Sequence, residues 1–185
     1  MLDEATIINE VLPGCIKGDR KSQEMLYRNF YKVMMNIAMR YTKNETDALD
    51  VLNTGFFKVY KHIKQFNPRH ASLYTWIRKV VINSCLDYAK KQKTYNAIQS
   101  FEGELPDVSI PADGLTKLSA NDILAFVRQL PSATQTVFNL YVIEGYNHIE
   151  IATLLDISEG TSKWHLSNAR KQLQLVINKQ ALRHE

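Results

Sequence analysis

The sequence predicts an all-α protein made of two small helical domains joined by a flexible acidic linker, the C-terminal domain being a helix-turn-helix. Apolar residues recur every three to four positions on both sides of residues 94–118, as in amphipathic helices. Gly and Pro are few, seven and five in 185 residues, and several of them cluster between residues 103 and 114. We therefore expect domains at 1–93 and 119–185, with a linker at 94–118.

Charge is organised along the chain, although the formal net charge is only +4. Residues 58–93 contain nine Lys or Arg and a single acidic residue, Asp87. Residues 94–116 contain four acidic residues and no Lys or Arg. A basic block beside an acidic linker is compatible with a polyanionic partner for the block.

Three long helices are expected in the first domain. The helix from Ser22 to Tyr41 has one apolar stripe: Leu26, Phe30, Val33, Met34, Ile37, Ala38 and Tyr41. Asn44 can cap the next helix, 46–66, with Asp47 as an acceptor for free amides. Its apolar face comprises Leu49, Leu52, Phe56, Val59, Tyr60, Ile63 and Phe66. Asn67-Pro68 ends this helix, because the residue before a proline is driven out of the α region.

The third helix should run from about Ser72 to Lys93. Its inward residues are expected to be Leu73, Trp76, Ile77, Val80, Val81 and Ser84. A different side of this helix carries polar residues at i, i+4, i+7 and i+8: Asn83, Asp87, Lys90 and Lys91. Arg78 and Lys79 extend the basic surface. Three aromatic residues flank the loop Asn67–Ser72: Phe66, Tyr74 and Trp76. Together, the basic surface and these aromatic residues supply the cationic and aromatic groups that hold unstacked bases.

Two simpler interpretations of this helix remain open. The polar face could be an ordinary solvated surface, and Trp76 could belong to the core. A similar choice applies to helix 46–66, where Asp50, Asn53, Thr54 and Phe57 fall at i, i+3, i+4 and i+7. Phe57 beside polar groups would suit a protein partner, or it could be one stray exposed aromatic.

The second domain begins with a helix over roughly 121–129, followed by a helix that Pro131 starts, where a missing amide is harmless. Gly145 is a candidate left-handed C-cap. Asn147 and Glu150 form an N-x-x-E capping box, and Asp156-Ile157-Ser158 makes a tight turn before a last helix that Ser158 caps. A helix, short turn and helix over 147–174 match the helix-turn-helix plan, in which the second helix enters the major groove of DNA.

The second helix of this motif separates buried from exposed positions. Ser162, Leu166, Ala169 and Leu173, spaced 4, 3 and 4, should face inward. The opposite surface consists of Thr161, Lys163, Trp164, His165, Ser167, Asn168, Arg170 and Lys171. These side chains can contact phosphates or read base edges. Any basic amphipathic helix has such a face, so the caps, the turn and the spacing together carry the prediction of DNA binding.

Several classes of site receive no support from the sequence. Cys15 and Cys85 have no metal-ligand spacing, so we expect buried, reduced thiols. The five histidines make no ligand spacing, and no P-loop, H-E-x-x-H or glycine fingerprint occurs. We therefore expect no metal, no cofactor and no catalytic residue. The N-terminus does not resemble a signal peptide, and no apolar run reaches 18 residues, which predicts a cytoplasmic protein without membrane insertion.

Motifs spread over most of the chain resemble the extracytoplasmic-function (ECF) sigma factors of bacterial RNA polymerase. The similar segments are Gly18-Asp19 with Leu26-Tyr27, 47–53 with 56–60, Trp76-Ile77 with Asn83, Asp87 and Lys90-Lys91, Leu130-Pro131, 144–146, 150–152, 157–161, and Ala169-Arg170. Asn53 and Thr54 stand where that family often has Gln and Glu. Ser162 replaces a usual Val, and Trp164 a residue that is often small and polar.

The resemblance implies an alternative sigma factor, which is not an enzyme. Its 46–66 helix would bind core RNA polymerase through Asp47, Asp50, Asn53, Thr54 and Phe57. The −10 element of the promoter DNA would contact Asn67, Arg69, Trp76, Arg78, Lys79, Asn83, Asp87, Lys90 and Lys91. Residues 160–171 would bind the −35 element, and the linker would thread the polymerase cleft. Members of this family commonly have an anti-sigma factor as a further partner.

Two other functions are weighed against this one. A self-sufficient DNA-binding regulator would also fit residues 147–173, and it would bind duplex DNA tightly without polymerase. The N-terminal half argues against it, because it lacks the βαβ alternation of a receiver domain. An enzyme acting on nucleic acid is disfavoured because no catalytic motif is present.

Overall fold

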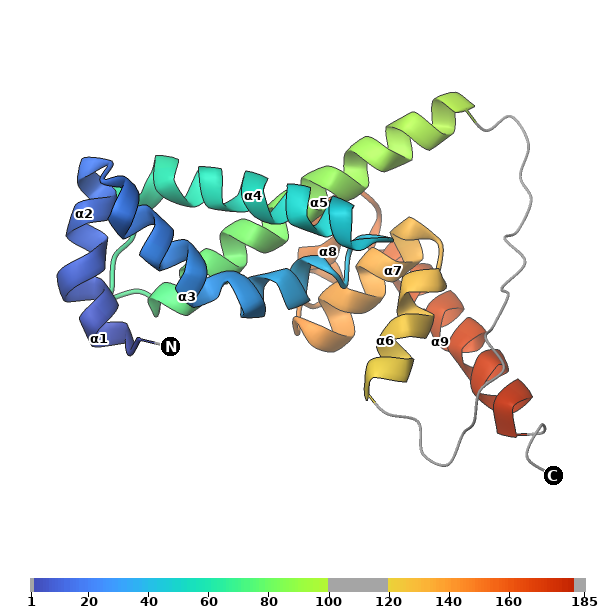
Figure 1. Cartoon of the computed structure of the whole chain (residues 1–185). Coiled ribbons are helices and arrows are strands. Elements are labelled where there is room, and N and C mark those ends of the chain that lie inside the picture. Colours follow the sequence, from blue (N-terminus) through green and yellow to red (C-terminus); the bar gives the residue numbers. More distant parts are fainter. Residues whose placement is uncertain (1, 100–119, 182–185) are drawn as a thin grey trace. The chain divides into compact units, whose positions relative to one another are not determined.

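The computed structural model describes the backbone of residues 2–99 and 120–181 and the side chains of residues 2–91 and 123–176. Every regular element in these ranges is a helix (Figure 1), which confirms the predicted all-α class. A search of the described residues for membrane-spanning helices finds none with the required length and hydropathy. The chain divides into two compact units, Met1–Tyr88 and Ala89–Glu185.

The first unit opens with short helical segments: α1 (Glu4–Thr6), a π-type turn (Ile7–Val11) and α2 (Leu12–Lys17). Two long helices follow, α3 (Arg20–Ala38) and α4 (Glu45–His62), and they lie side by side. A 3-10 turn (Ile63–Gln65) ends α4, and α5 (Leu73–Gln99) then begins in this unit.

Helix α3 begins two residues before the predicted start and ends three residues before the predicted end, Tyr41. Gly18, at φ +81°, ends α2 in a conformation that only glycine adopts readily. Asp19 is the N-cap of α3, and its Oδ2 accepts hydrogen bonds from Ser22 N (2.8 Å) and Ser22 Oγ (2.7 Å). These bonds satisfy an amide that the helix leaves unpaired, and they hold the Asp19 pKa below its usual range.

Helix α4 has the predicted cap. Asn44 Oδ1 accepts a hydrogen bond from Asp47 N at 2.8 Å. Asp47 accepts a bond from the Asn44 side-chain amide at 2.9 Å, which differs from the predicted role of accepting backbone amides. The prediction that Leu49 faces inward is wrong, because its side chain is 37% exposed. The buried stripe runs through Ala48 instead, and Leu49 is turned about 100° from it.

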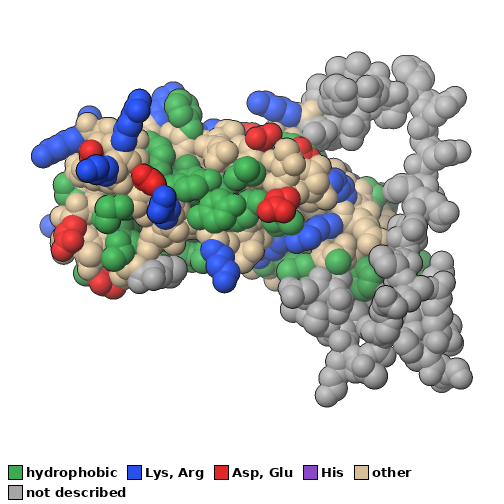
Figure 2. Space-filling view, viewed as in Figure 1, with side chains coloured by type: hydrophobic (Ala, Val, Ile, Leu, Met, Phe, Trp, Pro, Cys, Tyr) green, Lys and Arg blue, Asp and Glu red, His purple; other side chains and the backbone are tan. Residues whose placement is uncertain are grey.

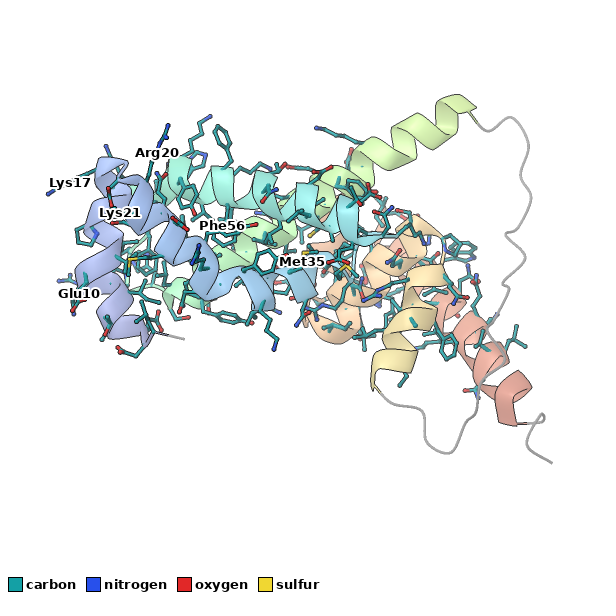
Figure 3. All side chains as sticks on the ribbon, in the orientation of Figure 1. Glu10, Lys17, Arg20, Lys21, Met35 and Phe56 are labelled. Carbon is teal, nitrogen blue, oxygen red and sulfur yellow. The ribbon has the colours of Figure 1, made fainter. Side chains whose placement is uncertain are left out.

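Aromatic rings and one glycine set the packing around α4. Phe56 points from α4 toward α3 (Figure 3), where its ring meets Tyr27 edge-on with centroids 4.7 Å apart. On the side facing α5, a Cβ atom on Gly55 would lie 3.1 Å from Val81 Cγ2 and 3.4 Å from Val81 Cα. The absence of a side chain at residue 55 therefore lets α4 and α5 approach closely.

Helix α5 begins as predicted, with Ser72 Oγ accepting from Thr75 N at 3.1 Å. It continues to Gln99, six residues beyond the predicted end, because residues 94–99 contain no Gly or Pro. The remaining part of the predicted linker, 100–118, lies outside the described residues. Leu73, Ile77, Val81 and Ser84 are buried as predicted. Trp76 and Val80 are only half-buried, whereas Ile82 and Leu86 are buried and were not predicted to be.

The second unit contains α6 (Ala120–Gln129), α7 (Ser132–Phe138), a π-type turn (Asn139–Ile143), α8 (His148–Leu155) and α9 (Glu159–Ala181). Pro131 precedes α7, and Gly145, at φ +80°, follows the π-type turn as the predicted left-handed residue. The apolar core of the second unit comprises Phe126, Val127, Leu130, Val137, Phe138, Leu140, Ile151, Leu166 and Ala169. Ser162, Leu166 and Ala169 are buried as predicted, and Leu173 is half-buried.

The two cysteines are free and buried, as predicted. Cys15 is 3% exposed. Its burial, together with the nearby Asp19 carboxylate, raises the pKa of the thiol to about 11. The reactive thiolate form is therefore scarce near neutral pH.

Candidate nucleic-acid interface

Helices α8 and α9 form the predicted helix-turn-helix. In the capping box, Asn147 Oδ1 accepts from Glu150 N at 2.9 Å, and Glu150 Oε2 accepts from Asn147 N at 2.8 Å. Asp156 ends α8 in the left-handed conformation, at φ 55°. Ser158 Oγ then accepts from Thr161 N at 3.0 Å and so caps α9. Local cap chemistry thus fixes both ends of the turn.

A polar contact joins the two helices of the motif inside its apolar packing. His148 Nδ1 on α8 shares a hydrogen bond of 2.9 Å with Ser162 Oγ on α9. The side chain of Ser162 is fully buried, and the His148 ring stacks on Tyr141 at 4.5 Å. Because a buried hydroxyl without a partner would be costly, this bond ties the rotation of α9 to α8.

The predicted −35 residues on α9 fall into two groups. Six of them are exposed: Thr161, Lys163, Trp164, Ser167, Arg170 and Lys171. Lys163 Nζ contacts the Glu159 carboxylate at 2.6 Å, and this interaction lowers the Glu159 pKa. His165 and Asn168 are half-buried. Asn168 Oδ1 accepts a hydrogen bond from Gln172 Nε2 at 3.3 Å.

The side chain of His165 makes one hydrogen bond and one ring contact with other residues. Its Nδ1 shares a hydrogen bond of 3.0 Å with Thr134 Oγ1 on α7. Its ring meets Trp164 in an edge-on arrangement, with centroids 4.9 Å apart. Thr134 was not identified from the sequence, because its partner lies 31 positions away and no local pattern signals the contact.

The predicted −10 residues on α5 share a polar surface. Lys79, Asn83, Asp87, Lys90 and Lys91 are exposed, and Arg78 is half-buried. Asp87 is paired with Lys58 of α4, with Nζ and Oδ2 2.6 Å apart. The Asp87 side chain is 56% exposed and that of Lys58 33%. The acidic member of this surface is therefore neutralised from the neighbouring helix.

The loop before α5 is organised by its own side chains. Asn67 Oδ1 accepts from Arg69 N at 3.0 Å, and both residues are exposed. Phe66 and Trp76 pack with ring centroids 5.8 Å apart, which leaves Trp76 half-buried between core and solvent. Glu4 of α1 accepts a hydrogen bond from Leu73 N at the start of α5. This tie, across 69 positions, was not predictable from the sequence.

The third predicted surface is on α4. Asp50, Asn53, Thr54 and Phe57 are exposed, Phe57 at 69%, and Asp47 is half-buried. Hydrophobic side chains gather over α3 and α4 on the face seen in Figure 2. The exposed large hydrophobic residues of these two helices are Met25, Tyr31, Leu49 and Phe57. Asn53 Oδ1 accepts from Tyr27 OH at 2.9 Å, and Asp47 Oδ2 accepts from Tyr88 OH at 2.9 Å.

Comparison with known proteins identifies the family of the chain. The family model described as sigma-70 region 2 matches residues 26–95, and the model described as sigma-70, region 4, matches residues 120–173. The chain belongs to the sigma-70 family. Together the two models cover the exposed face of α4, the polar face of α5 and the helix-turn-helix as far as residue 173.

Among curated sigma factors, the chain is 24% identical to the ECF RNA polymerase sigma factor SigM of Mycobacterium tuberculosis, over 91% of this chain and 83% of that protein. It is 25% identical to SigM of Bacillus subtilis, over 84% of this chain and 97% of that protein. In fold, it is similar to the sigma factor RpoE of Bartonella quintana, with a TM-score of 0.52 and 18% identity over 84% of this chain and 96% of that one.

This sigma factor is thus of the ECF type, as the sequence motifs suggested. It is an alternative sigma factor that binds core RNA polymerase and directs transcription initiation at specific promoters. It is a non-enzymatic initiation factor.

Proposed function

We propose that this sigma factor uses three separate surfaces: one on α4 for core polymerase, one on α5 and its preceding loop for the −10 element, and one on α9 for the −35 element. The observation that carries the proposal is that each surface faces solvent on a different helix and has a different chemistry. In this division, residues 1–93 and 119–185 are the two functional domains and 94–118 is the linker.

The α4 surface suits a protein partner. Phe57 is a large exposed aromatic side chain among Asp50, Asn53 and Thr54, and Asp47 lies at the edge of the same group. Exposed aromatic residues rimmed by polar groups are typical of protein interfaces. We propose these five residues as the contact with core polymerase.

The α5 surface suits DNA that is being opened. Exposed Lys79, Lys90 and Lys91 supply positive charge for phosphates, and Asn83 can hydrogen-bond to a base. Trp76 offers an aromatic ring near the loop, as in sites that hold unstacked bases. The proposed −10 set is Asn67, Arg69, Trp76, Arg78, Lys79, Asn83, Asp87, Lys90 and Lys91.

The α9 surface suits duplex DNA. Its exposed residues include hydrogen-bonding groups and three cations, and it belongs to the second helix of a helix-turn-helix, the element that reads the major groove in such motifs. The proposed −35 set is Thr161, Lys163, Trp164, His165, Ser167, Asn168, Arg170 and Lys171. Because two weak DNA contacts on one polymerase gain from effective concentration, neither surface must bind tightly alone.

An anti-sigma factor is the third proposed partner. The Bartonella quintana RpoE of similar fold was crystallised in complex with the anti-sigma factor NepR. A protein that covers the α4 surface would compete directly with polymerase. Since sigma factors act on polymerase, we propose the cytoplasm as the site of action.

Three single substitutions separate the surfaces in transcription assays with bacterial core enzyme. Phe57→Ala should reduce co-elution with core enzyme at least tenfold, because it removes the largest exposed apolar side chain of the α4 surface. Asn83→Ala should leave co-elution unchanged and reduce promoter opening, measured by permanganate reactivity. Arg170→Ala should leave both co-elution and opening of a preformed complex unchanged, but weaken initial promoter binding.

The matched control is Ile16→Ala, which trims an exposed apolar side chain on α2 (40% exposed) outside all three surfaces. It should behave as the unmodified protein in every assay. Normal co-elution of the Phe57→Ala variant, or equal loss of all activities in all three variants, contradicts the assignment of separate surfaces.

A further inference from the structure

Trp164 is a large exposed aromatic residue among polar and charged residues on α9. Its side chain is 61% exposed, although the neighbouring exposed residues Lys163, Ser167 and Arg170 are polar or charged. It is the sixth residue of α9 and shares a face with Thr161 and Asn168, three positions before and four after it. In helix-turn-helix proteins, this N-terminal part of the second helix meets the base edges.

The indole ring of Trp164 packs against the ring of His165. The edge-on contact with His165 holds one side of it at a centroid distance of 4.9 Å. His165 is in turn fixed by its 3.0 Å hydrogen bond to Thr134 of α7, whose side chain is only 1% exposed. The hydrogen bond between Thr134 and His165 and the ring contact between His165 and Trp164 therefore restrict the motion of the exposed indole ring. This restriction lowers the conformational entropy that the Trp164 side chain loses on binding a ligand.

We propose that Trp164 reads the 5-methyl group of a thymine in the −35 element, and that His165 and Thr134 are positioning residues for its ring. The thymine methyl is the apolar group that the major groove displays, and apolar side chains contact it there. The flanking cations fit a nucleic acid rather than an apolar protein surface. This inference rests on the proposed contact between α9 and the −35 element.

The test uses the holoenzyme and a promoter found by selection from a random library. Each thymine of the −35 element is replaced in turn by deoxyuridine, which removes only the methyl group. One replacement should weaken promoter binding roughly fourfold, the contribution expected from burying one methyl group. For Trp164→Ala, the same replacement should have no effect, because the group that senses the methyl is gone.

The positioning role has its own readout, the ratio of binding to the thymine and deoxyuridine promoters. Thr134→Val removes the hydroxyl that holds His165 and should bring this ratio toward one, while leaving binding to non-specific DNA unchanged. Thr134→Ser keeps the hydroxyl and should retain the full ratio. A ratio unchanged in Thr134→Val would overturn the positioning role.

Leu175→Ala is the matched control, because Leu175 is 63% exposed on the same helix, eleven residues further on. It should retain the fourfold discrimination. The proposal for Trp164 is overturned if no thymine is sensitive in the unmodified protein, if sensitivity persists in Trp164→Ala, or if that variant loses core binding instead. If mutating the −35 element has no effect at all, the proposed role of α9 itself fails, which is a separate result.

Discussion

The hydroxyl group of Tyr88 on α5 donates a 2.9 Å hydrogen bond to the carboxylate of Asp47 on α4. The same carboxylate oxygen accepts from the Asn44 side chain at the cap of α4. One oxygen atom therefore joins the start of the helix proposed to bind polymerase to the helix proposed to bind the −10 element. Neither helix can rotate freely while this bond is made.

Tyr88→Phe should lower the free energy of unfolding of the first unit by about 1 kcal/mol, because a hydrogen bond to a charged, half-buried group is lost. The chain has two tryptophans, Trp76 and Trp164, one in each unit. In a Trp164→Phe background, urea unfolding followed by Trp76 fluorescence therefore reports on the first unit. Tyr74→Phe, at a 41% exposed ring on the same helix, is the control and should change stability by less than about 0.5 kcal/mol.

The Lys58–Asp87 pair should matter more for DNA than for stability. As a partly exposed ion pair, it contributes about 0–1 kcal/mol to folding. Removing Lys58 would leave the Asp87 carboxylate unneutralised on a surface proposed to face phosphates. We expect Lys58→Met to slow promoter opening several-fold in a permanganate assay. The double variant Lys58→Met/Asp87→Asn should recover most of the rate; if it opens promoters no faster than Lys58→Met, charge repulsion is not the cause.

The capping box of α8 should contribute measurably to the second unit. Asn147→Ala removes the acceptor of the Glu150 amide, and an N-cap loss of this kind costs about 1 kcal/mol. In a Trp76→Phe background, Trp164 fluorescence during urea unfolding reports on this unit. Asn147→Ser keeps a capping oxygen and should stay close to the parent; equal destabilisation by Ala and Ser would show that the cap is not responsible.

Acid should weaken the start of α3. The folded-state pKa of Asp19 lies below its unfolded value because the charged carboxylate accepts two hydrogen bonds from Ser22. The stabilisation is therefore fully present above pH of about 4, the unfolded value, and is lost as pH falls through the folded pKa. Comparing urea unfolding of the protein and of Asp19→Asn from pH 6 to 2.5 should show a shallower pH dependence for the variant. Identical slopes would mean that other carboxyl groups control the acid transition.

Features that depend on neighbouring residues were predicted correctly from the sequence. The Asn44 cap, the Asn147–Glu150 box and the left-handed Gly145 each follow from chemistry within a few positions. The order of the helices along the chain was also predicted correctly, because amphipathic spacing is a local pattern. The cap at Asp19 was missed because no apolar residue marks the first turn of α3.

Features that depend on distant residues were not predictable. The inward faces of α4 and α5 were only partly correct, because apolar spacing defines a stripe but not its edges, so Leu49 was placed inside and Leu86 was overlooked. The contacts that position the candidate sites are tertiary: His148–Ser162, Thr134–His165 and Tyr88–Asp47 join different helices. The sequence could place site residues on helix faces, but not identify what holds them.

The absence of a side chain at Gly55 sets the spacing between α4 and α5. With α4 and α5 touching at Val81, a missing methyl group fixes the lateral offset between the surface proposed to bind polymerase and the surface proposed to bind the −10 element. A relative with alanine at this position would need either a smaller residue opposite it or a wider spacing. Grafting one helix of the pair between such relatives should therefore fail unless both are exchanged together.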